Sequence, residues 1–230
     1  MSNAQETALV AGFFGPSPGF FVEVGANDPH ARSQTFHLEK AGWDGILVEP
    51  QPDLARELRA KRTAKVFEAA CSSPANAGSI MPLHVAGPLS SLDRSGMAAG
   101  AQPERVIQVP VRTLDDILEE GRAPAEIDLL SIDVEGHELE VLAGLDLNRR
   151  RPKLILLEDH VGNLSRHRFM RGAGYKLIRR FDSNGWYTPV EARVRLKSSD
   201  IWPILRKYYL ALHFRKFRNY SRKLRGKLHC

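Results

Sequence analysis

The sequence predicts an α/β fold in which helices cover a doubly wound, mainly parallel sheet that ends in a C-terminal antiparallel hairpin. Two observations lead to this prediction. Apolar runs alternate with amphipathic segments along the chain, and the main apolar runs end on acidic residues. Alternating strands and helices are typical of parallel sheets with right-handed crossovers, and such sheets bind ligands outside the carboxyl ends of their strands.

The first third of the chain supplies the opening strands. A short helix over residues 4–11 and the turn GPSPG precede FFVEV, an apolar run expected to be a buried strand. A helix over 33–41 and a second strand, DGILVEP, follow. Pro52 is typical of a helix start, and the spacing of apolar residues predicts an amphipathic helix to about residue 62, before a third strand, KVFEAAC.

The remaining elements follow the same logic. SIMPLHV and RVIQVPV are expected strands around a loop at 87–103, which is long enough to be a substrate lid. Thr113 with Asp116 marks a helix start, and IDLLSIDVEG is a strong central strand that leads into the helix HELEVLAGL. KLILLEDH is the next strand, with a substrate-facing loop over 161–174. YKLIRRF and WYTPV surround the turn DSNG and are expected to form a hairpin.

Size and charge indicate one globular domain, residues 1–200, followed by a basic tail, residues 201–230. The net charge of +6 arises in the tail, which has nine Lys or Arg residues and no acid. Nucleic-acid binding by the domain is therefore not expected. The two cysteines lack metal-ligand spacing, and no secretory signal or spanning segment is apparent, so we expect a cytoplasmic protein.

The tail is expected to be a basic amphipathic helix. Its apolar residues are spaced mostly three or four apart, at Leu205, Tyr208, Leu212, Phe217, Tyr220, Leu224 and Leu228. Such a helix can lie on an anionic membrane surface, which predicts peripheral attachment to the inner face of the membrane. Packing on the domain or on a second subunit is the alternative. RNA binding is a third interpretation, without a stacking motif to support it.

Four predicted strand ends carry acids that should converge on one edge of the sheet: Glu23, Glu49, Asp133 with Glu135, and Glu158 with Asp159. Gly25 sits in the turn after FFVEV, where a residue without Cβ lets a ligand approach the backbone. Glu49 lies 24 residues later, close to the offset of about 20 at which an acid binds ribose hydroxyls. The dinucleotide fingerprint G-x-G-x-x-G is absent, because the loop reads GANDPH.

Five motifs together resemble the FkbM-type methyltransferases, over roughly residues 20–160: FVEVGAN, GWDGILVEPQP, VRTLDDIL, LLSIDVEGHELEVLAG and LLEDH. The resemblance implies a Rossmann-like methyltransferase fold and transfer of a methyl group from S-adenosylmethionine to a hydroxyl, in many members that of a sugar. By position it implies cofactor contacts from Glu23, Gly25 and Asn27 at the methionine end, Glu49 at the ribose, Ala70 and Cys71 at the adenine, and Asp133 facing the methyl.

Two residues depart from the family pattern. Pro29 stands where many members have a second glycine, and Ser131 stands where a lysine often occurs. Because proline has no amide proton, the loop after the first strand is expected to offer one hydrogen bond fewer to the cofactor carboxylate.

Methyl transfer to an alcohol needs in-line positioning and a base. The candidates lie on neighbouring strand ends and are Asp133, Glu135, His137, Glu158 and His160. His137 and Glu158 are preferred, although His137 could instead face solvent in the first helical turn. The cluster could also hold a divalent cation that polarises the hydroxyl, with Asp133, Glu158 and Asp159 as ligands.

The function expected from the sequence is therefore S-adenosylmethionine-dependent O-methylation of a sugar or glycan, including a lipid-linked one. An enzyme that uses NAD or a nucleotide to modify sugars is the first alternative. A non-catalytic binding module on the same fold is the second, because a fold does not guarantee chemistry.

Overall fold

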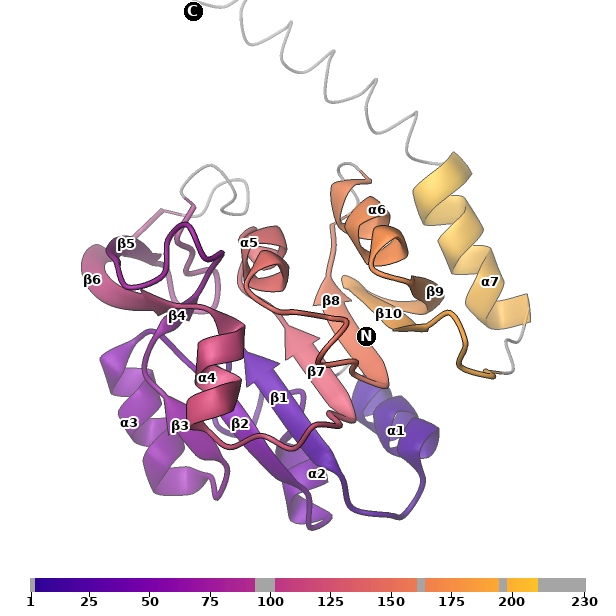
Figure 1. Cartoon of the computed structure of the whole chain (residues 1–230), viewed down its shortest axis with the longest axis horizontal. Coiled ribbons are helices and arrows are strands. Elements are labelled where there is room, and N and C mark those ends of the chain that lie inside the picture. Colours follow the sequence, from indigo (N-terminus) through magenta and orange to yellow (C-terminus); the bar gives the residue numbers. More distant parts are fainter. Residues whose placement is uncertain (1–2, 94–101, 161–163, 195–197, 211–230) are drawn as a thin grey trace, which may run out of the picture.

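The computed structural model describes residues 3–93, 102–160, 164–194 and 198–210 and forms a seven-stranded sheet with helices on both faces (Figure 1). The strand order is β3-β2-β1-β7-β8-β10-β9. Strands β3, β2, β1, β7 and β8 are parallel, and β10 runs antiparallel to both of its neighbours. The predicted doubly wound, mainly parallel sheet is confirmed.

The described residues contain the following strands and helices, grouped by sheet and numbered in chain order. The strands of the large sheet are β1 (Phe20–Val24), β2 (Asp44–Val48), β3 (Lys65–Phe67), β7 (Leu129–Ile132), β8 (Leu154–Glu158), β9 (Tyr175–Phe181) and β10 (Asn184–Pro189). A smaller sheet contains β4 (Ala70–Cys71), β6 (Arg105–Arg112) and β5 (Ile80–Val85). The helices are α1 (Asn3–Phe14), α2 (Phe36–Lys40), α3 (Pro52–Lys61), α4 (Leu114–Glu120), α5 (Glu138–Ala143), α6 (Ser165–Gly172) and α7 (Ser198–Ile204).

Three predicted boundaries were wrong. KVFEAAC is not one strand, because β3 pairs with β2 while β4 leaves the large sheet to pair with β6. Helix α2 begins at Phe36 rather than at residue 33, since the side chains of Ser33 and Thr35 bind Glu23. Part of the predicted loop over 161–174 is helix α6. This helix is short, and its buried residues are His167 and Met170, three positions apart, so its apolar periodicity is weak.

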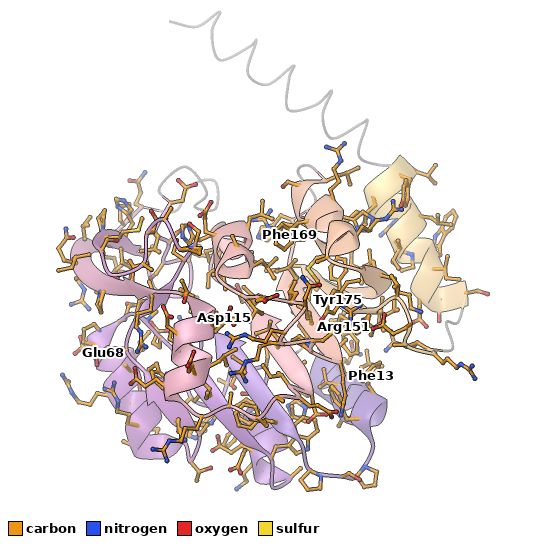
Figure 2. All side chains as sticks on the ribbon, viewed as in Figure 1. Phe13, Glu68, Asp115, Arg151, Phe169 and Tyr175 are labelled. Carbon is orange, nitrogen blue, oxygen red and sulfur yellow. The ribbon has the colours of Figure 1, made fainter. Side chains whose placement is uncertain are left out.

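Alternating residues of the strands supply two hydrophobic layers. Ile132, for example, faces the layer shared with α4, α5 and α6, whereas Leu129 faces the layer shared with α1, α2 and α3. Side chains fill the space between the sheet and α6, including the labelled Phe169 and Tyr175 (Figure 2). Because both faces are covered, the exposed part of the sheet that can take a ligand is the carboxyl edge of its parallel strands.

The described part of the tail lies beside β9. Helix α7 contains Pro203, and the chain continues as a wider, π-helical turn over Leu205–Leu210. Within this turn Tyr208 is buried and its hydroxyl donates to Asp159 Oδ2 at 2.8 Å. No helix among the described residues has the length and apolar character needed to cross a bilayer. Residues 94–101 of the expected lid and residues 211–230 of the tail lie outside the described residues.

The turn after β1 joins three strand ends. The amides of Gly25 and Ala26 both donate to Val48 O, and the amide of Asp133 donates to Val24 O. Gly25 has a φ of 83°, and a Cβ there would lie 1.9 Å from the Asp133 carbonyl oxygen. The glycine is therefore required by contact with the neighbouring strand end as well as by its left-handed backbone.

A Gly25→Ala variant should lose more than about 2 kcal/mol of unfolding free energy. The left-handed conformation alone costs an L-residue about 1–2 kcal/mol, and the clash with Asp133 adds to this cost. Gly12, in α1, is the matched control because a Cβ there meets nothing within 4 Å, and Gly12→Ala should stabilise by about 0.5–1 kcal/mol. Urea unfolding would measure both, and equal stability of the two variants would contradict the assigned role.

Candidate active site

A cavity of about 230 Å³ lies at the carboxyl edge of the sheet. We call it the main cavity. The ends of β1 and β2 contribute Gly25, Asn27 and Glu49, and the DVEGHE turn after β7 contributes Asp133, Glu135 and His137. Ala70 and Cys71 of β4 form another part of the wall, together with Leu92 from the loop after β5. The structure thus brings the expected cofactor residues to one cavity.

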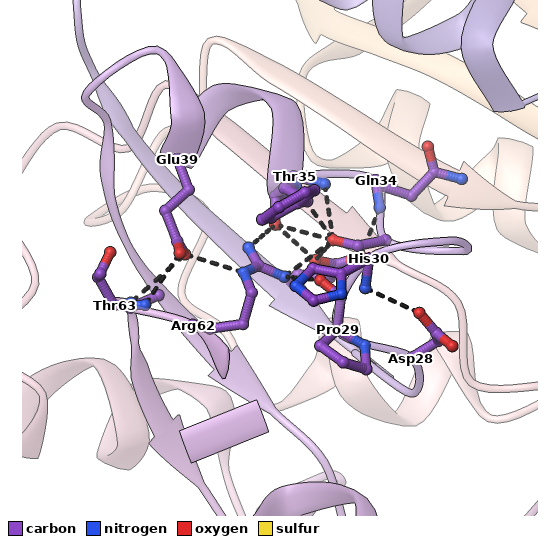
Figure 3. Close-up of polar contacts among 12 residues, drawn as sticks. Asp28, Pro29, His30, Gln34, Thr35, Glu39, Arg62 and Thr63 are labelled. Atoms are coloured by element: carbon purple, nitrogen blue, oxygen red, sulfur yellow. Dashed lines mark hydrogen bonds and ion pairs between the residues drawn. The ribbon is translucent and has the colours of Figure 1, made fainter. Parts of the chain in front are cut away.

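Arg62, just after α3, organises the loop between β1 and α2 (Figure 3). Its buried guanidinium donates to Pro29 O at 3.2 Å, to Ser33 Oγ at 3.0 Å and to Thr35 Oγ1 at 3.0 Å. On its other side Nε donates to Glu39 at 3.0 Å, a salt bridge in which the Arg62 side chain is fully buried. The guanidinium fork therefore fixes a loop that has no regular secondary structure.

Glu23 is held by the same loop. Its carboxylate accepts hydrogen bonds from Gln34 N at 2.7 Å, Ser33 Oγ at 2.9 Å and Thr35 Oγ1 at 2.5 Å. Burial raises the pKa of Glu23, while these donors and Arg62 act in the opposite direction. Glu23 lines the main cavity, but its hydrogen bonds serve to shape the loop.

Glu49 directly follows β2 and lies in the wall of the main cavity. Its two oxygens accept from the backbone amides of Asn27 and Gln51, each at 2.9 Å, and the residue is 2% exposed. Burial raises its pKa to about 7, against the lowering effect of these amides and of a hydrogen bond from the Gln51 side chain. A carboxylate has about four acceptor sites, so one remains for a ligand that donates a hydrogen bond.

The part of the wall formed by β4 is apolar. Ala70 and Cys71 are both buried and lie near Leu83 and Leu92. Burial raises the pKa of the Cys71 thiol to about 12, so this cysteine is an apolar wall residue rather than a thiolate nucleophile.

The DVEGHE turn is held in a strained conformation. Glu135 and Gly136 have φ values of 51° and 106°. Glu138 Oε1 accepts from the amide of Gly136 at 2.8 Å, and its other oxygen pairs with Arg166 of α6. The Ser91 hydroxyl donates to Glu135 O at 2.7 Å, which ties the loop after β5 to the turn. Such strain is maintained only where surrounding contacts fix it, as is common at functional sites.

His137 is buried at the start of α5 rather than facing solvent. Its Nε2 lies 2.9 Å from Ser72 Oγ, which also accepts a hydrogen bond from the side-chain Nδ2 of Asn76. Since Asn76 donates to the serine oxygen, the serine proton is directed towards Nε2. Burial lowers the pKa of His137, in keeping with a neutral ring that accepts at this nitrogen.

Asp133, Glu135, Glu158 and His160 form an acid–histidine cluster. His160 Nε2 lies 3.2 Å from Glu158 Oε1, and the carboxyl groups of Asp133 and Glu158 are hydrogen-bonded to each other. Burial and then Glu158 raise the pKa of Asp133. Burial also acts to raise the pKa of Glu158, but His160, with Asp133 and Arg166, brings it below its usual value. Asp133 therefore keeps the shared proton while Glu158 is ionised.

The other two members respond to the same ionised carboxylate. Burial and Glu158 raise the pKa of Glu135 to about 7, and the hydrogen bond to Glu158 raises the pKa of His160. Ligand atoms of Glu135, Glu158 and His160 all lie within 4.8 Å of one another. The structure thus groups Glu158 with these two residues as the candidate metal-ligand set.

Asp159, expected as a metal ligand, has a different role. Its side chain accepts from the Tyr208 hydroxyl at 2.8 Å, and its carbonyl oxygen accepts from Arg180. Successive residues of a strand point to opposite faces, so Asp159 faces the C-terminal segment while Glu158 contacts Asp133.

A family model described as the methyltransferase FkbM domain matches residues 23–177, about two thirds of the chain. The chain belongs to the FkbM methyltransferase family. The FkbM match includes every residue of the main cavity and of the acid–histidine cluster. The chain has no significant match among curated proteins.

Sequence reasoning missed several residues that shape the FkbM site. Arg62 was expected only as the approximate end of an amphipathic helix, and its partners lie 23–33 positions away. Glu138 follows the DVEGH motif but bonds Arg166 in a stretch that was expected to be a loop. Ser72 could have been found, because it directly follows Cys71 at a strand end, the same position that identified the acids.

Glu49 makes the stability of the protein without ligand depend on pH. Its pKa in the fold, about 7, exceeds the ordinary value of 4.5, so its stabilising contribution is complete below pH 4.5 and is lost as pH rises to about 7. The loss is ~3 kcal/mol at about 1.4 kcal/mol per unit. Urea unfolding between pH 4 and 8 should show a shallower slope for Glu49→Gln than for the wild type. If Glu49→Gln kept the wild-type slope, the assignment would be contradicted. Glu119→Gln, which changes an exposed acid, is the control and should keep that slope.

Proposed function

We propose that this FkbM protein transfers a methyl group from S-adenosylmethionine to a hydroxyl oxygen of a sugar or glycan. The observation that carries the proposal is Glu49, a buried acid at the end of β2 with an acceptor site left for the main cavity. That site suits a ribose hydroxyl. The proposal rests on this geometry together with the methyltransferase family of the chain.

The rest of the main cavity fits the cofactor. The apolar surface of Ala70, Cys71 and Leu92 suits an adenine ring. At the other end, Arg32, an exposed residue of the cavity wall, can bind the methionine carboxylate. This contact makes up for the amide donor that Pro29 lacks.

Glu158 is the proposed general base. It is the ionised member of the cluster, and Asp133, which carries the shared proton, lies in the cavity wall beside it. His137 is the weaker candidate because Ser72 occupies its Nε2. When bound, S-adenosylmethionine supplies an electrophilic methyl group. The acceptor hydroxyl would give up its proton to the Asp133–Glu158 pair, in which Glu158 is the ionised member, and His160 stabilises that carboxylate beforehand.

A divalent cation bound by Glu135, Glu158 and His160 is a second candidate for activating the hydroxyl, favoured by the close approach of their ligand atoms. The two candidates differ in their response to chelation, because a side-chain base needs no metal.

The cofactor assignment predicts selective binding in calorimetry. S-adenosylmethionine should bind and NAD should not, since the loop lacks the dinucleotide fingerprint. Glu49→Ala should weaken S-adenosylmethionine binding about 10- to 100-fold, because a hydrogen bond to a charged group contributes about 1.5–3 kcal/mol. Glu119→Ala, which changes an exposed acid on α4, should bind normally. Normal binding by Glu49→Ala would refute the ribose assignment.

The base assignment predicts a loss of turnover without a loss of cofactor binding. With methyl glycosides as acceptors, Glu158→Gln should lower kcat about 10²- to 10⁴-fold, while the Kd for S-adenosylmethionine stays within about threefold. His137→Gln should lower kcat less. If exhaustive treatment with EDTA removes wild-type activity and Mg²⁺ restores it, the metal candidate replaces the base.

We also propose that the C-terminal segment attaches the enzyme to an anionic membrane surface, where a lipid-linked glycan is a suitable acceptor. Tyr208 faces inward, whereas several apolar residues of the same segment are exposed, namely Ile201, Trp202, Leu205, Tyr209 and Leu210. Exposed aromatic and aliphatic side chains beside the basic residues of 201–230 suit the headgroup region.

Flotation with liposomes that contain phosphatidylglycerol tests this attachment. Wild type should float at 50 mM salt and much less at 500 mM, because the basic contribution is screened. Trp202→Ser combined with Tyr209→Ser should weaken flotation several-fold. Ile80→Ser, at a residue of β5 that is 69% exposed, is the control and should not. Absence of wild-type flotation at low salt would refute the proposal.

A further inference from the structure

A second cavity of about 210 Å³ adjoins the main one, and we call it the side cavity. Three residues, Arg32, Gln34 and Asp133, line both cavities and so form the wall between them. The remainder of the side cavity comes from Ala31, next to Arg32, from α1, and from residues 181–184 where β9 turns into β10. A ligand there would be separated from a ligand in the main cavity only by these shared side chains.

The side cavity lies at the end of β8. Strand β8 is hydrogen-bonded between β7 and β10, and Asn184, the first residue of β10, pairs with Glu158. Asp133 on one side and Asn184 on the other both line the cavity. A molecule held there is therefore next to the hydrogen-bonded pair of Asp133 and Glu158, where the proposed base acts.

The polar groups of the side cavity are held in place by buried contacts. Glu6 of α1 is 4% exposed, and its oxygens accept from Asn184 Nδ2 and from Trp186 Nε1, each at 2.9 Å. Glu6 also hydrogen-bonds to the side chain of Gln34. These contacts orient two carboxamides towards one space, and the buried Gln34 oxygen has no partner within the described residues. An unpaired buried acceptor favours a ligand that donates O–H groups.

The charges of the side cavity disfavour an anionic ligand. Its lining includes the acids Glu6 and Asp182, and Asp133, which keeps the shared proton, is hydrogen-bonded to the ionised Glu158. Arg32 is the basic residue in the lining. A carboxylate or phosphate would therefore meet more acidic than basic groups, whereas a neutral molecule with many hydroxyls would find carboxamide and carboxyl partners.

We propose that the side cavity binds the acceptor as a neutral sugar, with hydroxyls on Gln34 and Asn184 and the reacting hydroxyl at the Asp133–Glu158 pair. This inference rests on the proposed function and adds to it the place and the charge of the acceptor.

Ala31→Trp provides the test. Ala31 is exposed and lines the side cavity but not the main one, so an indole there should block the acceptor and leave the cofactor site intact. Ala125→Trp, at an exposed position in the segment before β7, is the matched control. Calorimetry with S-adenosylmethionine, which also reports on folding, should give Kd values within twofold of the wild type for both variants.

Acceptor binding is measured by saturation-transfer NMR with S-adenosylhomocysteine present. The probes are the methyl glycosides of glucose, mannose, galactose and rhamnose, together with methyl glucuronide. Wild type and Ala125→Trp should bind at least one neutral glycoside and bind the glucuronide at least tenfold more weakly. Ala31→Trp should bind that glycoside at least tenfold more weakly than wild type.

The failures are distinguishable. If wild type does not bind S-adenosylmethionine, the proposed function fails. If it does, any of three results overturns the side-cavity proposal alone: binding of none of the neutral glycosides, preference for the glucuronide, or unchanged glycoside binding in Ala31→Trp.

Discussion

The contact between Gly25 and the backbone of Asp133 is the constraint on which the site depends. A Cβ at residue 25 would lie 1.9 Å from the Asp133 carbonyl oxygen, so the ends of β1 and β7 can meet only across a glycine. The same turn directs two amides to Val48 O at the end of β2. Three strand ends are thus brought within one cavity wall, and the acids that follow them are placed by backbone geometry before any side-chain contact forms.

Placing several acids on one edge of a sheet is costly unless their charges are compensated. The loop and Arg62 compensate Glu23, and His160 with Arg166 compensates Glu158. Asp133 is compensated by protonation, and the pKa of Glu49 rises to about 7 because it has backbone donors without a cation. This division suggests the roles that we propose: the acids paired with cations shape the site or accept a proton, and Glu49 keeps an acceptor site for a ligand.

The sequence allowed the sheet and the positions of the acids to be predicted, because a buried strand and its end leave a local signal. FFVEV and LLSID show an apolar run, an acid and a turn within a few residues. What the sequence did not reveal depends on pairings between distant segments. The division of KVFEAAC between two sheets, the fork of Arg62 and the salt bridge of Glu138 with Arg166 each need a partner from another element. Asp159 was misjudged because a strand end does not show which face each side chain takes.

The FkbM match divides the molecule in a way that agrees with its two cavities. Residues 23–177 contain the whole wall of the main cavity. The side cavity, by contrast, takes Glu6 from α1 and residues 181–184 from the β9–β10 turn, which lie outside the match on either side. If the shared domain carries the methyl donor and the base, the flanking segments carry what differs between acceptors. The orientation of Asn184 by Glu6, a contact between residues 178 positions apart, then joins the segments on either side of the FkbM match into one binding surface for the proposed acceptor.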